Sequence, residues 1–319
     1  MTNDRRQRAP AAGAIALYAR ATHGFDGRVA HATAVLQSAA LEHAGRIAQV
    51  TSLGVEGMVL TDLIVRNQLG IAVATIDTGR LHPQTSALVP EIEARYGIAV
   101  EVHRPQPQAV ARFVAAHGED AMRESLALRK TCCELRKIEP LSRLLAGRSA
   151  WVTGLRREQS HARAVVSFNE RDDAGRVKFN PLADWSWADV WHYAAQHDVP
   201  YNPLHDEFMP SIGCAPCTRA IAVGADFRSG RWWWESESAK ECGLHVSVHS
   251  RAAKAAAPSQ REGGGRFASA QADFGNAEVK GAQAPDRSQG EAAKECGLHV
   301  RTRAGAAKTS APEEVEAPA

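Results

Sequence analysis

Six cysteines carry the most reactive side chains of this 319-residue chain, and four of them form two close pairs. Cys132 and Cys133 are adjacent, while Cys214 and Cys217 follow about 80 residues later with two residues between them. In a reducing compartment, clustered cysteines are metal ligands or reactive thiols more often than disulfides. Four thiolates suit an iron–sulfur cluster or a structural zinc ion. Adjacent cysteines bend poorly around one small ion, so we favour a 4Fe–4S cluster over zinc and over a disulfide pair.

The other two cysteines lie in two copies of one segment. The sequence KECGLH occurs at 240–245, with Cys242, and again at 294–299, with Cys296. A neighbouring glycine, a nearby lysine and His245 are features that can hold Cys242 as a nucleophilic thiolate. A lone cysteine in a polar segment is usually inert, so the motif by itself leaves the role open. Two copies with a polar spacer indicate a tandem duplication and not a solenoid.

Three turns carry residues suited to an oxyanion or a nucleotide. SLGVEG at 52–57 places glycines before a helix, whose free amides attract anions, although its spacing matches no phosphate-loop fingerprint. DTGRLHP at 77–83 offers polar groups for a ribose or phosphate, or forms an ordinary turn. GLRREQS at 154–160 contains adjacent arginines, whose guanidinium forks suit sulfate or phosphate unless they only face solvent. Arg228 and Arg231 add positive charge just before three consecutive tryptophans.

An α/β fold has to position these residues. Strand-like runs at 46–51, 71–76, 98–102 and 149–153 alternate with helical patterns such as 58–69. This alternation predicts a parallel sheet flanked by helices on both faces. Ligands of such sheets bind at the carboxyl ends of the strands. Three of the four strands run into the turns described above, so we expect those turns to converge on one site.

The composition changes sharply beyond Trp234. Alanine, glycine, serine and charged residues dominate, with almost no large apolar residue between 250 and 293. Such a segment cannot bury enough surface to offset the entropy of ordering, so we expect disorder there. We therefore predict an α/β domain over 1–235, a mobile segment with the first KECGLH copy over 236–249, and a low-complexity tail over 250–319.

Charge and hydropathy exclude several classes of protein. The formal net charge of +2 gives no reason to expect a nucleic-acid partner. No run of about 18 apolar residues predicts a membrane-spanning helix. The small-residue run near the N-terminus is broken by Tyr18 and Arg20 and does not resemble a signal peptide. We expect a cytoplasmic protein, with a homo-oligomer as an open possibility.

Seven motifs, in order, resemble the assimilatory phosphoadenylyl-sulfate and adenylyl-sulfate reductases, and in particular their iron–sulfur branch. These motifs lie at 51–63, 76–83, 132–141, 153–160, 213–221, 230–235 and 240–245. The resemblance implies an adenine-nucleotide α-hydrolase-like (PP-loop) fold and a 4Fe–4S cluster on the four paired cysteines. It also implies reduction of adenosine 5'-phosphosulfate to sulfite and AMP. In that family the cluster is thought to order the site and to tune its field through Lys137, without carrying the electrons.

The resemblance also assigns residues to the reaction. Cys242, with Cys296 as the alternative and with His245 nearby, would attack the sulfate sulfur and form a cysteine S-sulfonate. Thioredoxin or glutaredoxin would then release sulfite, and because no thioredoxin-like domain is evident in the sequence, we expect this reductant to be a separate protein. The first turn has Gly57 where we expect an acidic residue. The implied substrate-binding residues are Ser52, Gly54, Asp77, Thr78, Gly79, Lys137, Gly154, Arg156, Arg157, Arg228 and Arg231.

Three alternatives stay open. The substrate can be the 3'-phosphorylated nucleotide, 3'-phosphoadenylyl sulfate. The chain can be a PP-loop transferase that activates its substrate by adenylation, although such chemistry needs no thiol. It can also be a zinc-stabilised nucleotide-binding or redox-sensing module without catalysis.

Overall fold

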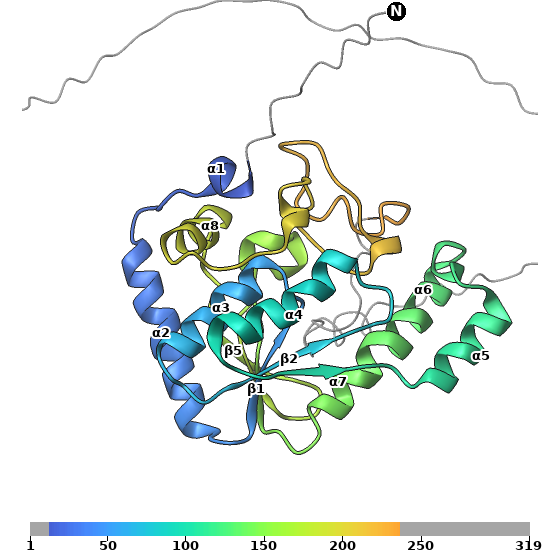
Figure 1. The fold of residues 1–319 in the computed structure, drawn as a ribbon, viewed down its shortest axis with the longest axis horizontal. Helices are drawn as coiled ribbons and strands as arrows, with labels where there is room; N and C mark the ends of the chain where they lie inside the picture. The colour runs from blue at the N-terminus through green and yellow to red at the C-terminus, as the bar shows by residue number, and fades with distance from the viewer. Residues whose placement is uncertain (1–12, 237–319) are drawn as a thin grey trace, which may run out of the picture. The chain divides into compact units, whose positions relative to one another are not determined.

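A computed structural model describes residues 13–236 of the chain, and Figure 1 shows their arrangement. Cys242, His245 and Cys296 lie outside the described residues, as do the predicted tail over 250–319 and the predicted mobile segment except for its first residue. Within 13–236, no helix is both long enough and apolar enough to cross a bilayer.

A six-stranded sheet in the order β3-β2-β1-β4-β6-β5 forms the centre of the fold. All neighbouring strands run parallel except β5, which lies antiparallel to β6 at one edge. The first four strands match the four predicted runs, and β5 and β6 are additional. The strands are β1 (Ile47–Thr51), β2 (Ala72–Ile76), β3 (Val100–His103), β4 (Ala150–Val152), β5 (Asn169–Arg171) and β6 (Val177–Phe179).

Helices cover both faces of the sheet, as predicted (Figure 1). Alternate strand residues point to opposite faces, so Val73 packs with the large core cluster while Ala74 packs with a smaller one. The large cluster takes side chains from α2 (Phe25–Glu42), α3 (Val55–Arg66), α4 (Pro83–Tyr96) and α8 (Trp187–Gln196). The smaller cluster joins α7 (Glu139–Leu144) to the opposite face. Two further helices are α1 (Ala14–Tyr18) and α5 (Pro107–His117).

A long helical segment carries the first cysteine pair. Helix α6 (Leu126–Cys133) continues through one turn of π-helix, Glu134–Ile138, directly into α7. Ser125 caps α6 by accepting the amide of Leu128 at 3.1 Å. Single π-helical turns within α-helices often mark functional sites. This turn presents residues 136 and 137 just after the cysteines.

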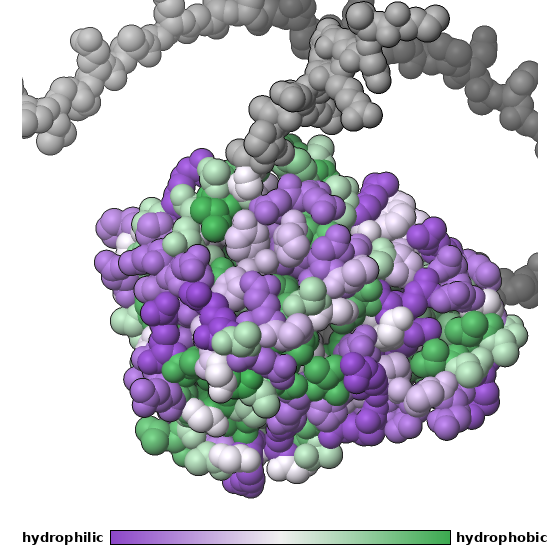
Figure 2. Space-filling model, in the orientation of Figure 1, coloured by the Kyte–Doolittle hydropathy of each residue, from purple (hydrophilic) through white to green (hydrophobic). Residues whose placement is uncertain are grey.

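Hydrophilic side chains cover most of the face seen in Figure 2, and apolar ones form small patches, one of them near α5. Large apolar side chains that are well exposed, such as Leu41 and Val165, are far apart in the sequence. Isolated apolar residues of this kind are normal on a protein surface.

Candidate active site

The carboxyl ends of β1, β2 and β4 open into a cavity of about 190 Å³. Its lining includes Ser52 and Gly54 after β1, Thr78 after β2 and Gly154 after β4. The segment 210–213 and residues near Trp232 form a further wall. The three turns predicted to converge do meet here, because parallel strands end at the same edge of the sheet.

The glycine turn after β1 is tightly packed against the end of that strand. A side chain at Gly57 would place its Cβ 2.1 Å from Thr51 Oγ1, so an acidic residue at this position would displace Thr51. A Cβ on Gly154 would lie 2.9 Å from that of Glu56. The carboxylate of this turn is therefore Glu56, which lines the cavity and which the sequence analysis missed.

Arg156 has a different place from the one expected for an anion-binding fork. It is fully buried and does not line the cavity. Its Nε donates to Glu56 Oε1 at 3.1 Å, and its Nη1 donates to Glu158 Oε2 at 2.8 Å. Gln159 Nε2 donates to the same Glu56 oxygen at 3.0 Å. Arg156 thus neutralises the carboxylate that faces the cavity.

Three other predicted residues also lie apart from the cavity lining. Arg157 Nε donates to a backbone carbonyl at 2.9 Å, and its guanidinium stacks on Phe168. Asp77 accepts the Gly79 amide at 2.9 Å and pairs with Arg104 at 3.0 Å. The contacts of Asp77 and Gly79 are those of an ordinary turn, which was the alternative reading of the motif at 77–83.

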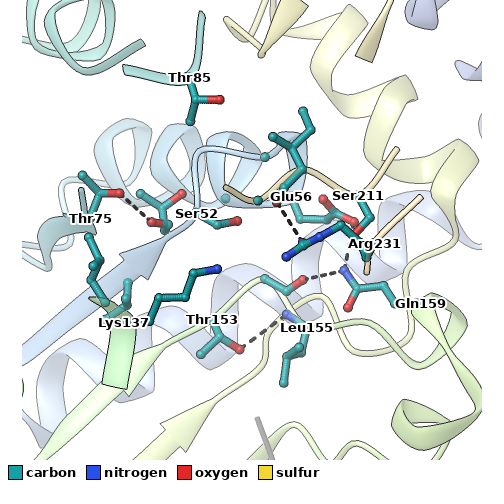
Figure 3. Close-up of a pocket in the computed structure, with 18 of the residues that line it drawn as sticks. Ser52, Glu56, Thr75, Thr85, Lys137, Thr153, Leu155, Gln159, Ser211 and Arg231 are labelled. Atoms are coloured by element: carbon teal, nitrogen blue, oxygen red, sulfur yellow. Dashed lines mark hydrogen bonds between the residues drawn. The ribbon is translucent and has the colours of Figure 1, made fainter. Parts of the chain in front are cut away.

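Cationic side chains surround the cavity from several elements. Lys137, Arg228 and Arg231 were predicted, whereas Arg163 was missed because it follows the double-arginine motif on a separate 3-10 turn, His161–Arg163. Figure 3 shows Lys137 and Arg231 reaching toward the cavity from different sides. Among the described residues that line it, Glu56 is the only carboxylate. Four cations against one neutralised anion give the cavity an excess of positive charge, which suits an anionic ligand.

Arg231 is held in place by its neighbours. Its guanidinium is buried and donates to the carbonyls of Ile212 and Cys217, each at 3.3 Å. A Cβ on Gly213 would come within 2.3 Å of Arg231 Nη2, so a larger residue there would displace this guanidinium. The carbonyl contacts orient the guanidinium without cancelling its charge.

Hydroxyl groups supply neutral donors and acceptors around the same cavity. Figure 3 shows Thr75, Thr85 and Ser211 among the lining residues. Thr75 donates to the Thr51 carbonyl at 2.9 Å, and Thr85 accepts from Asn202 at 2.7 Å. Hydroxyls of this kind suit the sugar of a nucleotide.

The four paired cysteines lie together. Each is buried, and all four line a second, small cavity with Arg129, Arg136 and Lys137. Thr78 links the two cysteine-bearing segments. Its Oγ1 lies 3.2 Å from Cys214 Sγ, and its carbonyl accepts a hydrogen bond from Arg136, at 2.8 Å, on the segment that follows Cys132 and Cys133. All four thiols are free of disulfides.

The thiols differ in their electrostatic surroundings. Burial raises the pKa of Cys132, and it raises the pKa of Cys217 to about 11. Burial also raises the pKa of Cys214, but Lys137 together with the other neighbours outweighs this effect and leaves that pKa below its usual value. The cations therefore offset part of the cost of thiolates in a buried site.

Four buried thiols around one cavity, with cations nearby, form a donor set that could hold an iron–sulfur cluster or a zinc ion. Within 13–236, no three histidine, cysteine or acidic side chains gather closely enough to hold one metal ion as they are placed.

Trp232 and Lys137 line both cavities. Trp232 is buried, has a φ of 38° and stacks with the guanidinium carbons of Arg129 and Arg231, each 4.6 Å from its ring centroid. A non-glycine residue in this left-handed region is uncommon and costs strain. The anion cavity and the cysteine cavity therefore share the wall that Trp232 and Lys137 form.

Comparisons with known proteins show which proteins this chain resembles. The phosphoadenosine phosphosulfate reductase domain family matches residues 46–220. The adenosine 5'-phosphosulfate reductase of Allochromatium vinosum is 55% identical over 196 residues, covering 61% of this chain and 77% of the relative. That of Burkholderia cepacia is 51% identical over 208 residues, covering 65% and 83%. The crystal structure of phosphoadenylyl-sulfate reductase from Candida auris with phosphate has a TM-score of 0.50 at 27% identity, covering 62% of this chain and 97% of that one.

Proposed function

The chain belongs to the phosphoadenosine phosphosulfate reductase domain family, and we propose that it reduces adenosine 5'-phosphosulfate to sulfite and AMP in assimilatory sulfate reduction. The observation that carries this proposal is the anion cavity at the strand ends, lined by four cations and one neutralised carboxylate. The names of the relatives supply the substrate class.

The described residues would bind and orient the substrate. The amides at the start of α3 and the guanidinium of Arg231 would face the phosphate and sulfate oxygens. Lys137 adds an ammonium, which would stabilise the negative charge that develops on the leaving phosphate. Neutral hydroxyls such as Thr85 would meet the ribose.

The covalent step is assigned to Cys242, with Cys296 as the alternative. The thiolate sulfur attacks the sulfate sulfur, the bond from that sulfur to the AMP phosphate oxygen breaks, and AMP leaves with the electron pair. A protein dithiol such as thioredoxin or glutaredoxin then attacks the cysteine sulfur of the S-sulfonate. The dithiol is oxidised to a disulfide, sulfite leaves with its sulfur reduced by two electrons, and the cysteine thiolate is restored. His245 would help to hold Cys242 as a thiolate.

The proposal includes a 4Fe–4S cluster held by Cys132, Cys133, Cys214 and Cys217. Four buried thiols lining one cavity with cations support this assignment. Bound there, the cluster would supply thiolate-ligated iron that orders the two cysteine segments. Lys137 lines both cavities and would place its positive charge between the thiolates and the substrate. Zinc in place of iron is the alternative, and metal analysis with the visible spectrum of anaerobically purified protein separates the two.

The test is intact-protein mass spectrometry after incubation with adenosine 5'-phosphosulfate and no reductant. We expect a sulfite-mass adduct on the wild-type protein and on Cys296→Ser, and none on Cys242→Ser. Addition of thioredoxin should release sulfite. An adduct retained on Cys242→Ser moves the nucleophile to Cys296, and the absence of both adduct and sulfite from the wild type contradicts the proposed reaction.

The 3'-phosphorylated nucleotide is the second candidate substrate, because the Candida auris enzyme of similar fold is a phosphoadenylyl-sulfate reductase. Parallel measurements of kcat/KM for the two nucleotides decide between them. We expect the nucleotide without the 3'-phosphate to be preferred, as the names of the more similar relatives indicate. We also propose that the protein is cytoplasmic.

A further inference from the structure

His205 lies outside all seven motifs, yet it connects two walls of the anion cavity. It ends the 3-10 turn Pro203–His205 and is buried. Its Nε2 lies 3.2 Å from the backbone nitrogen of Val55, and its Nδ1 lies 3.0 Å from the carbonyl oxygen of Met209. The two partners belong to segments that are far apart in the sequence, and each borders the cavity.

The two partners determine the protonation state of the ring. The Val55 amide can only donate, so Nε2 must accept, and the Met209 carbonyl can only accept, so Nδ1 must carry the proton. The ring is therefore neutral. The ring is packed edge-on against Trp187 and Trp191, with ring centroids 5.9 and 5.3 Å away. Burial accordingly lowers the pKa of His205 to about 4.

The contact with Val55 completes the start of α3. Val55 is the first residue of this helix, and Gly54 at its N-cap has no side chain with which to accept an amide. Amides in the first turn of a helix lack intrahelical acceptors. His205 supplies one from 150 residues away. With the Val55 amide occupied, those of Glu56 and Gly57 are the next along the first turn to face an anion.

The contact with Met209 fixes the opposite wall. Met209 directly precedes 210–213, all of which line the cavity. Arg231 rests on this same wall through the Ile212 carbonyl. A single imidazole thus sets the spacing between the helix amides and the segment that orients a buried cation.

We infer that His205 is a positioning residue for the sulfonucleotide. As a neutral ring that accepts from Val55 and donates to Met209, it holds the glycine turn against the 210–213 wall. No carboxylate or ammonium does both, because an ionised carboxylate cannot donate and an ammonium cannot accept. This inference rests on the proposed function, since it takes the cavity ligand to be the substrate or its product AMP.

The first test compares AMP binding by calorimetry in the full-length holoprotein and three variants. His205→Phe keeps an aromatic ring but removes both hydrogen bonds, and His205→Gln restores one donor and one acceptor. His192→Phe is the matched control, because His192 packs edge-on against Phe25 and does not line the cavity. We expect His205→Phe to weaken AMP binding about tenfold, His205→Gln to recover part of this loss, and the control to stay within about twofold.

The second test needs no variant. The ¹⁵N shifts of the His205 ring in the wild-type holoprotein at neutral pH should report the Nδ1-protonated tautomer, and an Nε2-protonated or charged ring overturns the inference. So does a folded His205→Phe protein that binds AMP as tightly as the wild type. If His205→Phe does not fold, the ¹⁵N shifts of the wild-type ring and the AMP affinity of His205→Gln decide whether the inference holds. Wild-type protein that binds neither AMP nor inorganic sulfate overturns the proposed function as well, which distinguishes the two failures.

Discussion

Replacement of Arg156 by methionine tests whether this side chain neutralises Glu56, as we expect, or binds the substrate anion directly. The Nε and Nη2 atoms of Arg156 each lie 3.1 Å from Glu56 Oε1, and the guanidinium is fully buried. At an effective dielectric constant of about 20, unit charges about 3 Å apart attract by roughly 5 kcal/mol. Removing one partner of a buried pair typically costs about 3–5 kcal/mol. Because Glu56 faces a cavity and is not fully buried, we expect the free energy of unfolding to fall by about 3 kcal/mol, which is the lower end of this range.

The same change should weaken ligand binding through Glu56. An uncompensated carboxylate on the cavity wall repels an anion. For a separation of about 6 Å and an effective dielectric constant of about 40, this repulsion is about 1.4 kcal/mol, or about tenfold in the dissociation constant. The loss is indirect, so removing the Glu56 charge as well should restore most of it.

The assay combines urea unfolding with AMP calorimetry on Arg156→Met, Glu56→Gln and the double variant. We expect the double variant to recover most of the stability and affinity that Arg156→Met loses. Arg157→Met serves as the comparison, because its guanidinium stacks on Phe168 away from the cavity lining, and its AMP affinity should change by less than about twofold. The reasoning is refuted if Arg156→Met keeps wild-type stability but loses an AMP affinity that Glu56→Gln does not restore.

Three further predictions concern single positions. Gly213→Ala should weaken AMP binding about tenfold in calorimetry, because the added Cβ would lie 2.3 Å from Arg231 Nη2 and would displace this guanidinium. An unchanged affinity would mean that the Arg231 guanidinium does not bind the ligand. Gly57→Ala should lower the free energy of unfolding in urea by about 1–3 kcal/mol, since its Cβ would lie 2.1 Å from Thr51 Oγ1, and a variant as stable as the wild type contradicts the packing. The pKa of His205 is about 4 in the folded protein and about 6.5 in the unfolded chain. The contribution of the neutral ring to the free energy of unfolding is therefore complete above pH 6.5, and it declines by at most about 3 kcal/mol as the pH falls to 4. Urea unfolding across this range should show the decline in the wild type and a flatter profile in His205→Gln.

Much of the fold and part of the site could be predicted from local patterns. The apolar runs that became β1 to β4 are readable because parallel strands are buried on both faces. The convergence of Ser52, Thr78 and Gly154 on one cavity follows from the strand direction alone. The strands β5 and β6, with three residues each, carry too short a pattern to be found in this way.

Residue type and order by themselves determined that this protein has a parallel α/β sheet, clustered cysteines and cations next to strand-end turns. Which cation faces the ligand was decided only by the tertiary structure. Arg156 and Arg231 look alike in sequence, but Arg156 meets Glu56 on α3, whereas Arg231 meets only backbone carbonyls and an indole among its described contacts. His205 shows the same limit, because its acceptor role depends on an amide 150 residues away. A charge or a ring nitrogen acquires its function from the groups packed around it, and those groups come together only when the chain folds.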